Sequence, residues 1–156
     1  MHINMTWLEE ELFHRSLSSE DKLILKGLIQ TKHYQKGDII IHEAQDADGL
    51  FILHSGCVAL QHEKHGQSVC IAKLSSGAQL GDMSVFNDEQ ASVTVKAIEE
   101  CEVYHFSQKS IQYMMEYRPS LSRDIMLNTI RHLAGAVRQM NDSKAHIQQY
   151  IQGAYG

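Results

Sequence analysis

Hydrophobic residues change their spacing along the chain, and the changes divide it into segments. Between residues 6 and 30 they recur at helical intervals, and Ser18-Ser19-Glu20-Asp21 interrupts them with a new N-cap, so we expect two short helices. From Lys36 onward the interval becomes two, which is typical of half-buried strands. These β-rich stretches are Asp38–His42, Gly49–His54, Cys57–His62, Ser68–Leu74, Ser92–Ile98 and Cys101–Phe106. The spacing predicts a barrel or roll of about eight short antiparallel strands.

Glycines mark the joints between these stretches. They lie at positions 37, 49, 56, 66 and 77, where a sharp turn needs a positive φ that glycine adopts at the lowest cost. The next glycine opens a different segment, Gly81–Phe86, in which hydrophobic and polar residues do not alternate. We expect a single helical turn there, between two strands.

Two helices are predicted after the strands. Ser107 is a suitable N-cap for a helix over Gln108–Tyr117, and Pro119 can begin the next helix because a first helical position needs no backbone donor. In that last helix one set of positions repeats in steps of four and three, as in a coiled-coil seam. The seam consists of Met126, Ile130, Leu133, Val137, Met140, Lys144, Ile147 and Ile151.

A long helix with such a seam needs a partner, because an isolated helix is only marginally stable in water. We expect its first turns to pack on the roll of the same chain and the part beyond Met140 to pair with a second copy. The expected state is therefore a homodimer with the seam as its interface. Lys144 would weaken the pairing and help to fix its register.

Length and composition fit one ordinary domain. The 156 residues are 43% hydrophobic, which suffices for one sizeable core and leaves no room for a second domain. We therefore treat residues 1–156 as a single domain, with N-terminal helices in 6–35, the roll in 36–106 and C-terminal helices in 107–152. The expected fold class is mainly β with flanking α-helices.

Charge and hydropathy argue against several partners. The net charge is −5 at pH 7, and the segment from Gly37 to Glu102 holds eleven carboxylates and three lysines, so we expect no nucleic acid partner. No apolar run approaches the roughly 20 residues of a membrane helix, and no secretory signal opens the chain, so we expect a cytoplasmic protein without a membrane partner. Cys57, Cys70 and Cys101 are expected to be reduced, partly buried thiols.

Several short motifs occur in a recognisable order. Lys36-Gly37-Asp38 opens the roll, residues 52–58 form an I-L-x-x-G-x-V hairpin, and residues 81–85 and 92–97 follow. Together with the predicted helices, they resemble the cyclic nucleotide-binding domain, the sensor module of catabolite-activator-type regulators, regulated kinases and gated channels. The resemblance implies a double-stranded β-helix, or jelly roll, with N-terminal helices and a long C-terminal helix. It also implies a ligand site at Gly81, Asp82, Met83, Ser84, Ala91 and Ser92.

The chain departs from the family at the residue that binds the phosphate. In the family, backbone N–H groups and one arginine bind the cyclic phosphate, and the alignment places Ala91 at the arginine position. No Lys or Arg lies between Lys73 and Lys96, and Asp82 replaces the family's ribose-binding glutamate. Loss of a charge-assisted hydrogen bond of roughly 1.5–3 kcal/mol implies a site about 10- to 150-fold weaker. We therefore expect a lost or altered ligand preference, with ordinary cAMP or cGMP binding as the less favoured alternative.

Catalytic and metal sites are not indicated. The serines and cysteines lie outside any nucleophile motif, and the cupin metal pattern fails because no histidine stands two residues after His42. No helix-turn-helix follows the long helix, so we expect no DNA binding. The leading hypothesis is a non-catalytic regulatory or sensor module in which a ligand at the roll shifts the final helices. The alternatives are a ligand-free dimerisation or adaptor domain for a separate effector protein and, more remotely, a cupin-like metal enzyme.

Overall fold

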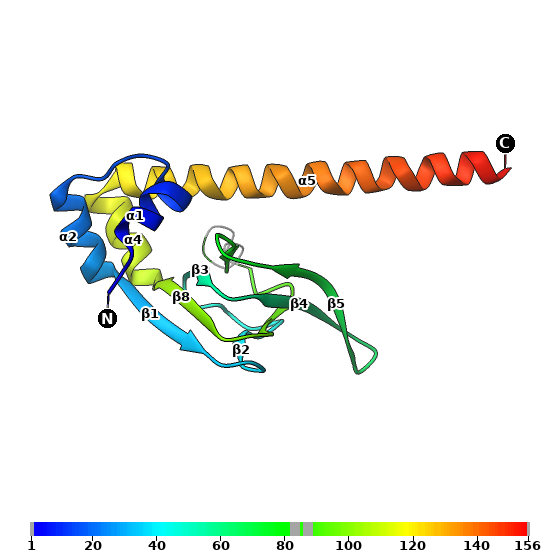
Figure 1. Ribbon diagram of the computed structural model, residues 1–156, viewed down its shortest axis with the longest axis horizontal. Helices are drawn as coiled ribbons and strands as arrows, with labels where there is room; N and C mark the ends of the chain where they lie inside the picture. Colours follow the sequence, from blue (N-terminus) through cyan, green and yellow to red (C-terminus); the bar gives the residue numbers. More distant parts are fainter. Residues whose placement is uncertain (1, 82–84, 86–88, 156) are drawn as a thin grey trace.

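Two four-stranded antiparallel sheets form a roll (Figure 1). The structure is a computed structural model that describes residues 2–81, 85 and 89–155, with side chains as far as residue 144. The strand order in the first sheet is β1 (Ile29–Tyr34), β8 (Cys101–Phe106), β3 (Leu50–Ser55) and β6 (Gln79–Leu80). The order in the second is β2 (Ile39–Ile41), β7 (Thr94–Ala97), β4 (Val58–Lys64) and β5 (Gln67–Leu74). The prediction of a jelly roll with flanking helices is confirmed.

Two of the strands lie where we expected none. Helix α2 (Ser19–Leu28) ends at Leu28, and residues 29–34 form β1, so the prediction of helices as far as residue 35 is wrong. Strand β1 pairs with β8 along its whole length, from Ile29 opposite Phe106 to Tyr34 opposite Cys101. This pairing satisfies the backbone donors and acceptors at the edge of β8 and so outweighs the local helical spacing. The other missed strand, β6, has only two residues.

Strand β3 is buried on both faces, which explains its unbroken run of apolar residues. Leu50 and Ile52 join a core that the sheet shares with the helices. Phe51 and Leu53 join a second core inside the roll. Strand β3 therefore connects the helical end of the molecule to the interior of the roll.

The short helices gather at one end of the roll (Figure 1). They are α1 (Met5–Leu8), the π-helix η1 (Glu9–Phe13), α2 and α4 (Gln108–Tyr117). Ser18 Oγ accepts a hydrogen bond from the backbone N–H of Asp21 at 3.0 Å, and Ser107 Oγ accepts one from Ser110 at 3.1 Å. Both predicted N-caps are thus confirmed.

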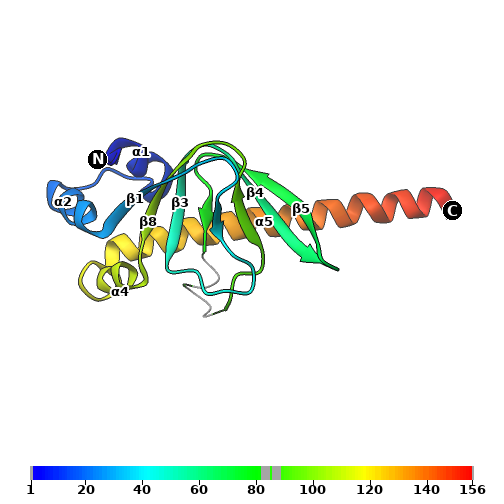
Figure 2. The same ribbon diagram turned by 90° about the horizontal axis from the view of Figure 1, so that it is seen from below.

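Helix α5 (Pro119–Tyr155) crosses the roll and continues well past it (Figure 1, Figure 2). The expectation that the first turns of the seam pack on the roll is wrong, because Met126 is 37% and Ile130 60% exposed. The helix packs through a neighbouring face instead. The buried residues of that face are Leu121, Ser122, Asp124, Ile125, Asn128 and Thr129. Neither α5 nor another helix in the described part of the chain is long and apolar enough to cross a membrane.

The rest of the described seam is also largely exposed, although Leu133 borders the space between α5 and the roll. Leu133, Val137 and Met140 are 50%, 54% and 61% exposed, and Lys144 is exposed as well. The side chains of Ile147 and Ile151 lie outside the described residues. Within one chain, the described part of the seam is therefore uncovered.

The three cysteines are free thiols in different surroundings. Cys101 is buried and Cys57 half-buried, but Cys70 is exposed, so the expectation of partial burial is wrong for Cys70. Cys70 lies on β5, an edge strand with a neighbour on one side only. Burial raises the pKa of the Cys101 thiol, which keeps it protonated and unreactive.

Candidate functional site

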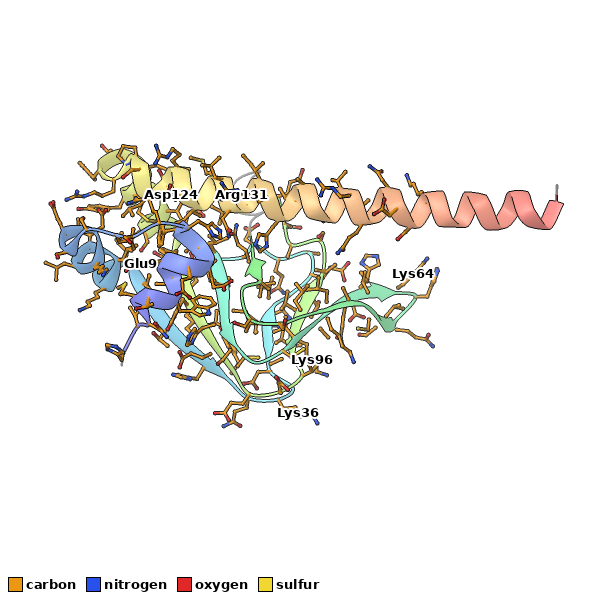
Figure 3. All side chains as sticks on the ribbon, turned by 45° about the horizontal axis from the view of Figure 1, so that its top comes forward. Glu9, Lys36, Lys64, Lys96, Asp124 and Arg131 are labelled. Atoms are coloured by element: carbon orange, nitrogen blue, oxygen red, sulfur yellow. The ribbon has the colours of Figure 1, made fainter. Side chains whose placement is uncertain are left out.

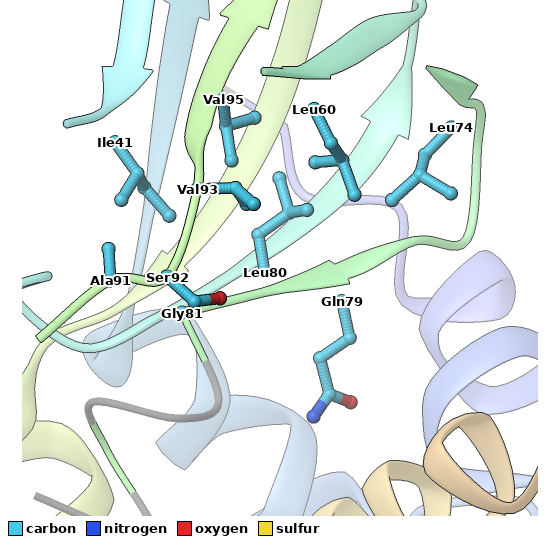
Figure 4. A pocket seen from close by; sticks show the side chains of 10 residues that line it. All are labelled: Ile41, Leu60, Leu74, Gln79, Leu80, Gly81, Ala91, Ser92, Val93 and Val95. Atoms are coloured by element: carbon cyan, nitrogen blue, oxygen red, sulfur yellow. The ribbon is translucent and has the colours of Figure 1, made fainter. Parts of the chain in front are cut away.

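A cavity of about 180 Å³ opens in the roll beside strand β6 (Figure 4). Gly81, Ala91 and Ser92, three of the predicted ligand residues, line its wall. The other three predicted residues lie outside the described part of the chain: Asp82, Met83 and Ser84. The remaining wall residues are Ile41, Leu60, Leu74, Gln79, Leu80, Val93 and Val95.

Two glycines approach each other beside this cavity. Gly81 has a φ of +82°, and a Cβ on it would lie 2.6 Å from the carbonyl oxygen of Gly49. Gly49 has a φ of +99°, and a Cβ there would meet the carbonyl of Phe106. Only glycine fits both positions, so close packing fixes the backbone at Gly81, where the predicted Gly81–Phe86 segment begins. The N–H of Val85 donates to the carbonyl of Gly81 at 3.2 Å, and the other residues of the predicted helical turn lie outside the described part of the chain.

The cavity wall is apolar and uncharged as far as the structure describes it. Its polar side chains are Gln79 and Ser92, and none of the described wall residues is charged. Three roll lysines lie elsewhere, with Lys64 toward the end of the β4–β5 hairpin and Lys36 and Lys96 on the side of the roll away from α5 (Figure 3). Among the described residues, no three His, Cys, Asp or Glu side chains are placed to hold a metal ion.

Gln79 turns its side chain away from the apolar wall and toward α5 (Figure 4). Its Oε1 accepts a hydrogen bond from Asn128 Nδ2 at 3.0 Å, and its Nε2 donates to Thr129 Oγ1. Thr129 Oγ1 donates to the carbonyl of Ile125 at 3.0 Å, and Asn128 Oδ1 accepts from His14 Nε2 at 3.0 Å. Asn128 is 2% and Thr129 5% exposed, so their ends of these hydrogen bonds are buried, whereas Gln79 is half-buried and His14 is exposed. One residue therefore belongs both to the cavity wall and to the contact between roll and helix.

An ion pair beside this network ties the N-terminal segment to α5. Arg15 Nε lies 2.6 Å from Asp124 Oδ2, and Asp124 is only 7% exposed. Arg15 and His14 follow η1 directly, so both contacts of this segment reach the same two turns of α5. The start of α5 is thus held from two sides, by β6 and by the end of η1.

The sequence profile described as the cyclic nucleotide-binding domain matches residues 31–118, more than half of the chain. The chain belongs to this family. The match begins in β1 and ends just before α5, so it includes the roll, the cavity wall and Gln79.

This cyclic nucleotide-binding domain is similar to proteins of known function and structure. It is 33% identical to the cAMP-dependent protein kinase regulatory subunit of Debaryomyces hansenii over 84 residues. The matched region covers 54% of this chain and 18% of that subunit. A cyclic nucleotide-binding domain from Methylobacillus flagellatus has a TM-score of 0.78 at 19% identity, over 88% of this chain and 80% of that one. The catabolite activator protein of Thermus thermophilus has a TM-score of 0.70 at 23% identity, over 86% of this chain and 63% of that one. The two structures show a shared fold, and the chain spans less than a fifth of the kinase subunit.

A second, larger cavity of about 620 Å³ separates the roll of this domain from α5. Its wall shares Leu60, Leu74 and Gln79 with the first cavity, so the two adjoin. On the helix side it is lined by residues that include Leu133 and Ala136. Beyond the Gln79 network, α5 is therefore not packed tightly on the roll.

His105 supports the loop that meets Gly81. It is 2% exposed, its ring stacks on Phe51 at 4.3 Å between centroids, and its Nε2–H donates to the carbonyl of Asp48. Its Nδ1 has no hydrogen-bond partner among the described residues. Burial lowers the pKa of His105, against the hydrogen bond to Asp48, so the folded domain favours the neutral ring.

Sequence reasoning missed the three polar residues that connect the roll to α5. Asn128 and Thr129 stand between the seam positions Met126 and Ile130, where a heptad pattern places solvent-facing residues. A signal was present, because Leu121, Ile125 and Asn128 also follow steps of four and three and mark a second face. For Gln79, which occupies a two-residue strand, the sequence carries no comparable signal.

Proposed function

We propose that this chain is a non-catalytic regulatory module that links the cavity in its roll to helix α5. The observation that carries the proposal is the double position of Gln79, in the cavity wall and in the buried network with Asn128 and Thr129. A ligand acts on a conformational equilibrium only if it prefers one arrangement, and Gln79 gives a cavity ligand such a preference. The similarity to a kinase regulatory subunit supports the same role.

We also propose that the module is a homodimer joined through α5. Leu133, Val137 and Met140 follow the heptad spacing, and each is at least half exposed. A stripe of this kind buries its apolar surface when a second α5 packs against it. The helix continues well past the roll, so the partner helix would have room to pack there (Figure 1).

The proposed module does not bind cAMP or cGMP in the manner usual for its family. Ala91 stands where the family has its phosphate-binding arginine, and the described wall contains no cationic side chain that could replace it. A ligand at 100 times its dissociation constant adds about 2.7 kcal/mol to the free energy of unfolding. Thermal unfolding with millimolar cAMP and cGMP should therefore show little stabilisation, and a shift at micromolar nucleotide would contradict this part of the proposal.

A second candidate function is a ligand-free dimerisation or adaptor domain for a separate effector protein. The exposed edge strand β5 favours it, because Val69 and Ile71 are 49% and 59% exposed there. Apolar side chains beside free strand-edge groups are suited to contact another protein. In this case the dimer would form, but no cavity ligand would change the contact between roll and α5.

The link through Gln79 can be tested by hydrogen exchange on the whole chain. Gln79→Met removes the amide and keeps a side chain of similar length, so we expect faster exchange in α5 around residues 125–136 with unchanged protection in β3 and β8. Gln112→Met, on the exposed surface of α4, is the matched control and should leave α5 as in the wild type. Equal exchange in both variants would contradict the link.

The dimer is tested by light scattering. A mass of twice 17.7 kDa is expected for the wild-type chain, and a mass of one chain at all accessible concentrations would contradict dimerisation.

A further inference from the structure

The cavity in the roll has the chemistry of a site for an apolar ligand. Its wall contains six aliphatic side chains, which converge from five strands and the segment before β7 (Figure 4). These side chains are Ile41, Leu60, Leu74, Leu80, Val93 and Val95. Burial of an apolar ligand against such a surface is favourable, whereas a charged ligand loses its hydration there and finds no compensating partner.

The polar groups of the wall do not change this chemistry. The amide of Gln79 points out of the aliphatic cluster and is engaged by Asn128 and Thr129 of α5. Ser92 adds a hydroxyl beside Gly81, and a hydroxyl does not balance the charge of a phosphate (Figure 4). An anion in this cavity would lose its hydration without gaining a cation from the described wall.

The size of the cavity limits the ligand further. An apolar cavity of about 150 Å³ in another protein binds benzene, and the cavity here measures about 180 Å³. One aromatic ring with a small substituent fits this volume. A nucleotide, with base, sugar and phosphate, would extend well beyond the aliphatic pocket.

We propose that this cavity binds a small uncharged aromatic compound in place of a cyclic nucleotide. The regulatory meaning of such binding rests on the proposed function, whereas the binding itself depends only on the cavity. The compound's ring lies among the six aliphatic side chains, and its polar substituent lies toward Ser92.

Three probes of nearly equal shape test this ligand class. Benzyl alcohol is neutral, benzoate is an anion and benzylamine is a cation at neutral pH. In methyl-labelled wild-type protein, benzyl alcohol should shift the NMR signals of the six aliphatic wall residues saturably, with a dissociation constant of about 1 mM or lower. Benzoate and benzylamine should each bind at least about 10-fold more weakly. Equal or tighter binding of either ion, or no saturable shift with benzyl alcohol, would overturn the proposal.

A matched pair of variants locates the binding. Val93→Phe fills the cavity and should weaken benzyl alcohol binding at least about 10-fold, while Val69→Phe makes the same change on the exposed face of β5 and should leave it unaltered. The methyl spectrum of each variant reports whether the roll is folded. Equal loss in both folded variants, or no loss in Val93→Phe, would overturn the assignment to this cavity.

Ala91→Arg should shift the cavity's preference from a neutral aromatic ligand toward an anionic one. It places a guanidinium in the wall, so benzyl alcohol should bind more weakly and cAMP about 10- to 150-fold more tightly than to the wild type. The wild-type chain could bind benzyl alcohol and yet be monomeric, or show no change in α5 exchange in Gln79→Met. That result would support this inference and contradict the proposed function. Tight cAMP binding by a dimeric wild-type chain would overturn this inference and the nucleotide part of the proposed function, while the proposed dimer and the link through Gln79 would remain.

Discussion

Helix α5 buries three polar residues beside Leu121 and Ile125 on one face, and exposes apolar residues on another. On the face toward the roll, Asp124, Asn128 and Thr129 are 2–7% exposed, although their side chains are polar. On the other face, Ile130 and Val137 are 60% and 54% exposed, although their side chains are apolar. Hydrogen bonds and ion pairs are directional, so the polar face fixes one position of the helix on its own roll. Apolar contact grows with buried area, so the other face is suited to a second copy of the chain.

A charge on the apolar face should have the largest effect of any single change. Val137→Asp would place two carboxylates without partners in the proposed dimer interface, at a cost of about 3 kcal/mol or more. We expect dimer affinity to fall about 100-fold or more, measured by sedimentation or by light scattering over a dilution series. The free energy of unfolding of the monomer should change little, because Val137 is 54% exposed within one chain.

The adjacent residue provides the control for this variant. Arg138→Gln changes the net charge by the same amount and lies off the seam, so the dimer should persist. If the two variants dissociate equally, net charge rather than the apolar face controls association. That result would contradict the assignment of the apolar face of α5 as the dimer interface.

A change on the polar face should act on the fold and spare the dimer. Asn128→Ala removes the hydrogen bonds to the carbonyl of Gln79 and from the ring N–H of His14, which costs about 1 kcal/mol because water can reach both partners. In a chain of this length, that corresponds to a fall in melting temperature of about 2–4 °C per kcal/mol, seen by calorimetry at fixed protein concentration. Asn141→Ala, an exposed position on the same helix, should leave the melting temperature nearly unchanged.

The apolar face could be predicted from the sequence and the polar face could not. The seam repeats over many turns, and each member adds to one pattern, so Leu133, Val137 and Met140 were found without a structure. The contacts of Gln79 with Asn128 and Thr129 join residues about 50 positions apart through single hydrogen bonds. Such contacts depend on how β6 and α5 meet in space, which no local spacing encodes.

The roll shows the same division. Turn glycines and alternating residues predicted six of its strands, because both features are local. Strand β1 was missed because its sequence, IQTKHY, does not alternate apolar and polar residues and its partner, β8, is far along the chain. The cavity could be placed only through the family motif at Gly81 and Ala91, while its aliphatic wall comes from strands that the fold brings together.

His105 is buried, and unlike the polar residues of α5 it has a ring nitrogen, Nδ1, without a hydrogen-bond partner among the described residues. Burial lowers the pKa of His105, so the unfolded chain binds the proton more readily than the folded one. Its contribution to stability is complete above the unfolded pKa of about 6.5 and is lost as the pH falls below it. We expect the free energy of unfolding to decrease from pH 7 to pH 5, and His105→Gln to reduce that slope, measured by urea unfolding at each pH. His42→Gln, at an exposed position, should retain the wild-type slope.

The smallest effect is expected on the third face of α5, where charged residues meet water. Arg131 is exposed and lies about two turns beyond Asp124 on α5 (Figure 3). Arg131→Gln should change the free energy of unfolding by less than about 0.5 kcal/mol and leave dimer affinity unchanged, because a solvated cation off both packing faces contributes little. The same urea and dilution experiments measure both quantities. A loss comparable to that of Asn128→Ala would mean that Arg131 neutralises carboxylates of the roll, and the helix would then have a third face that packs through charge.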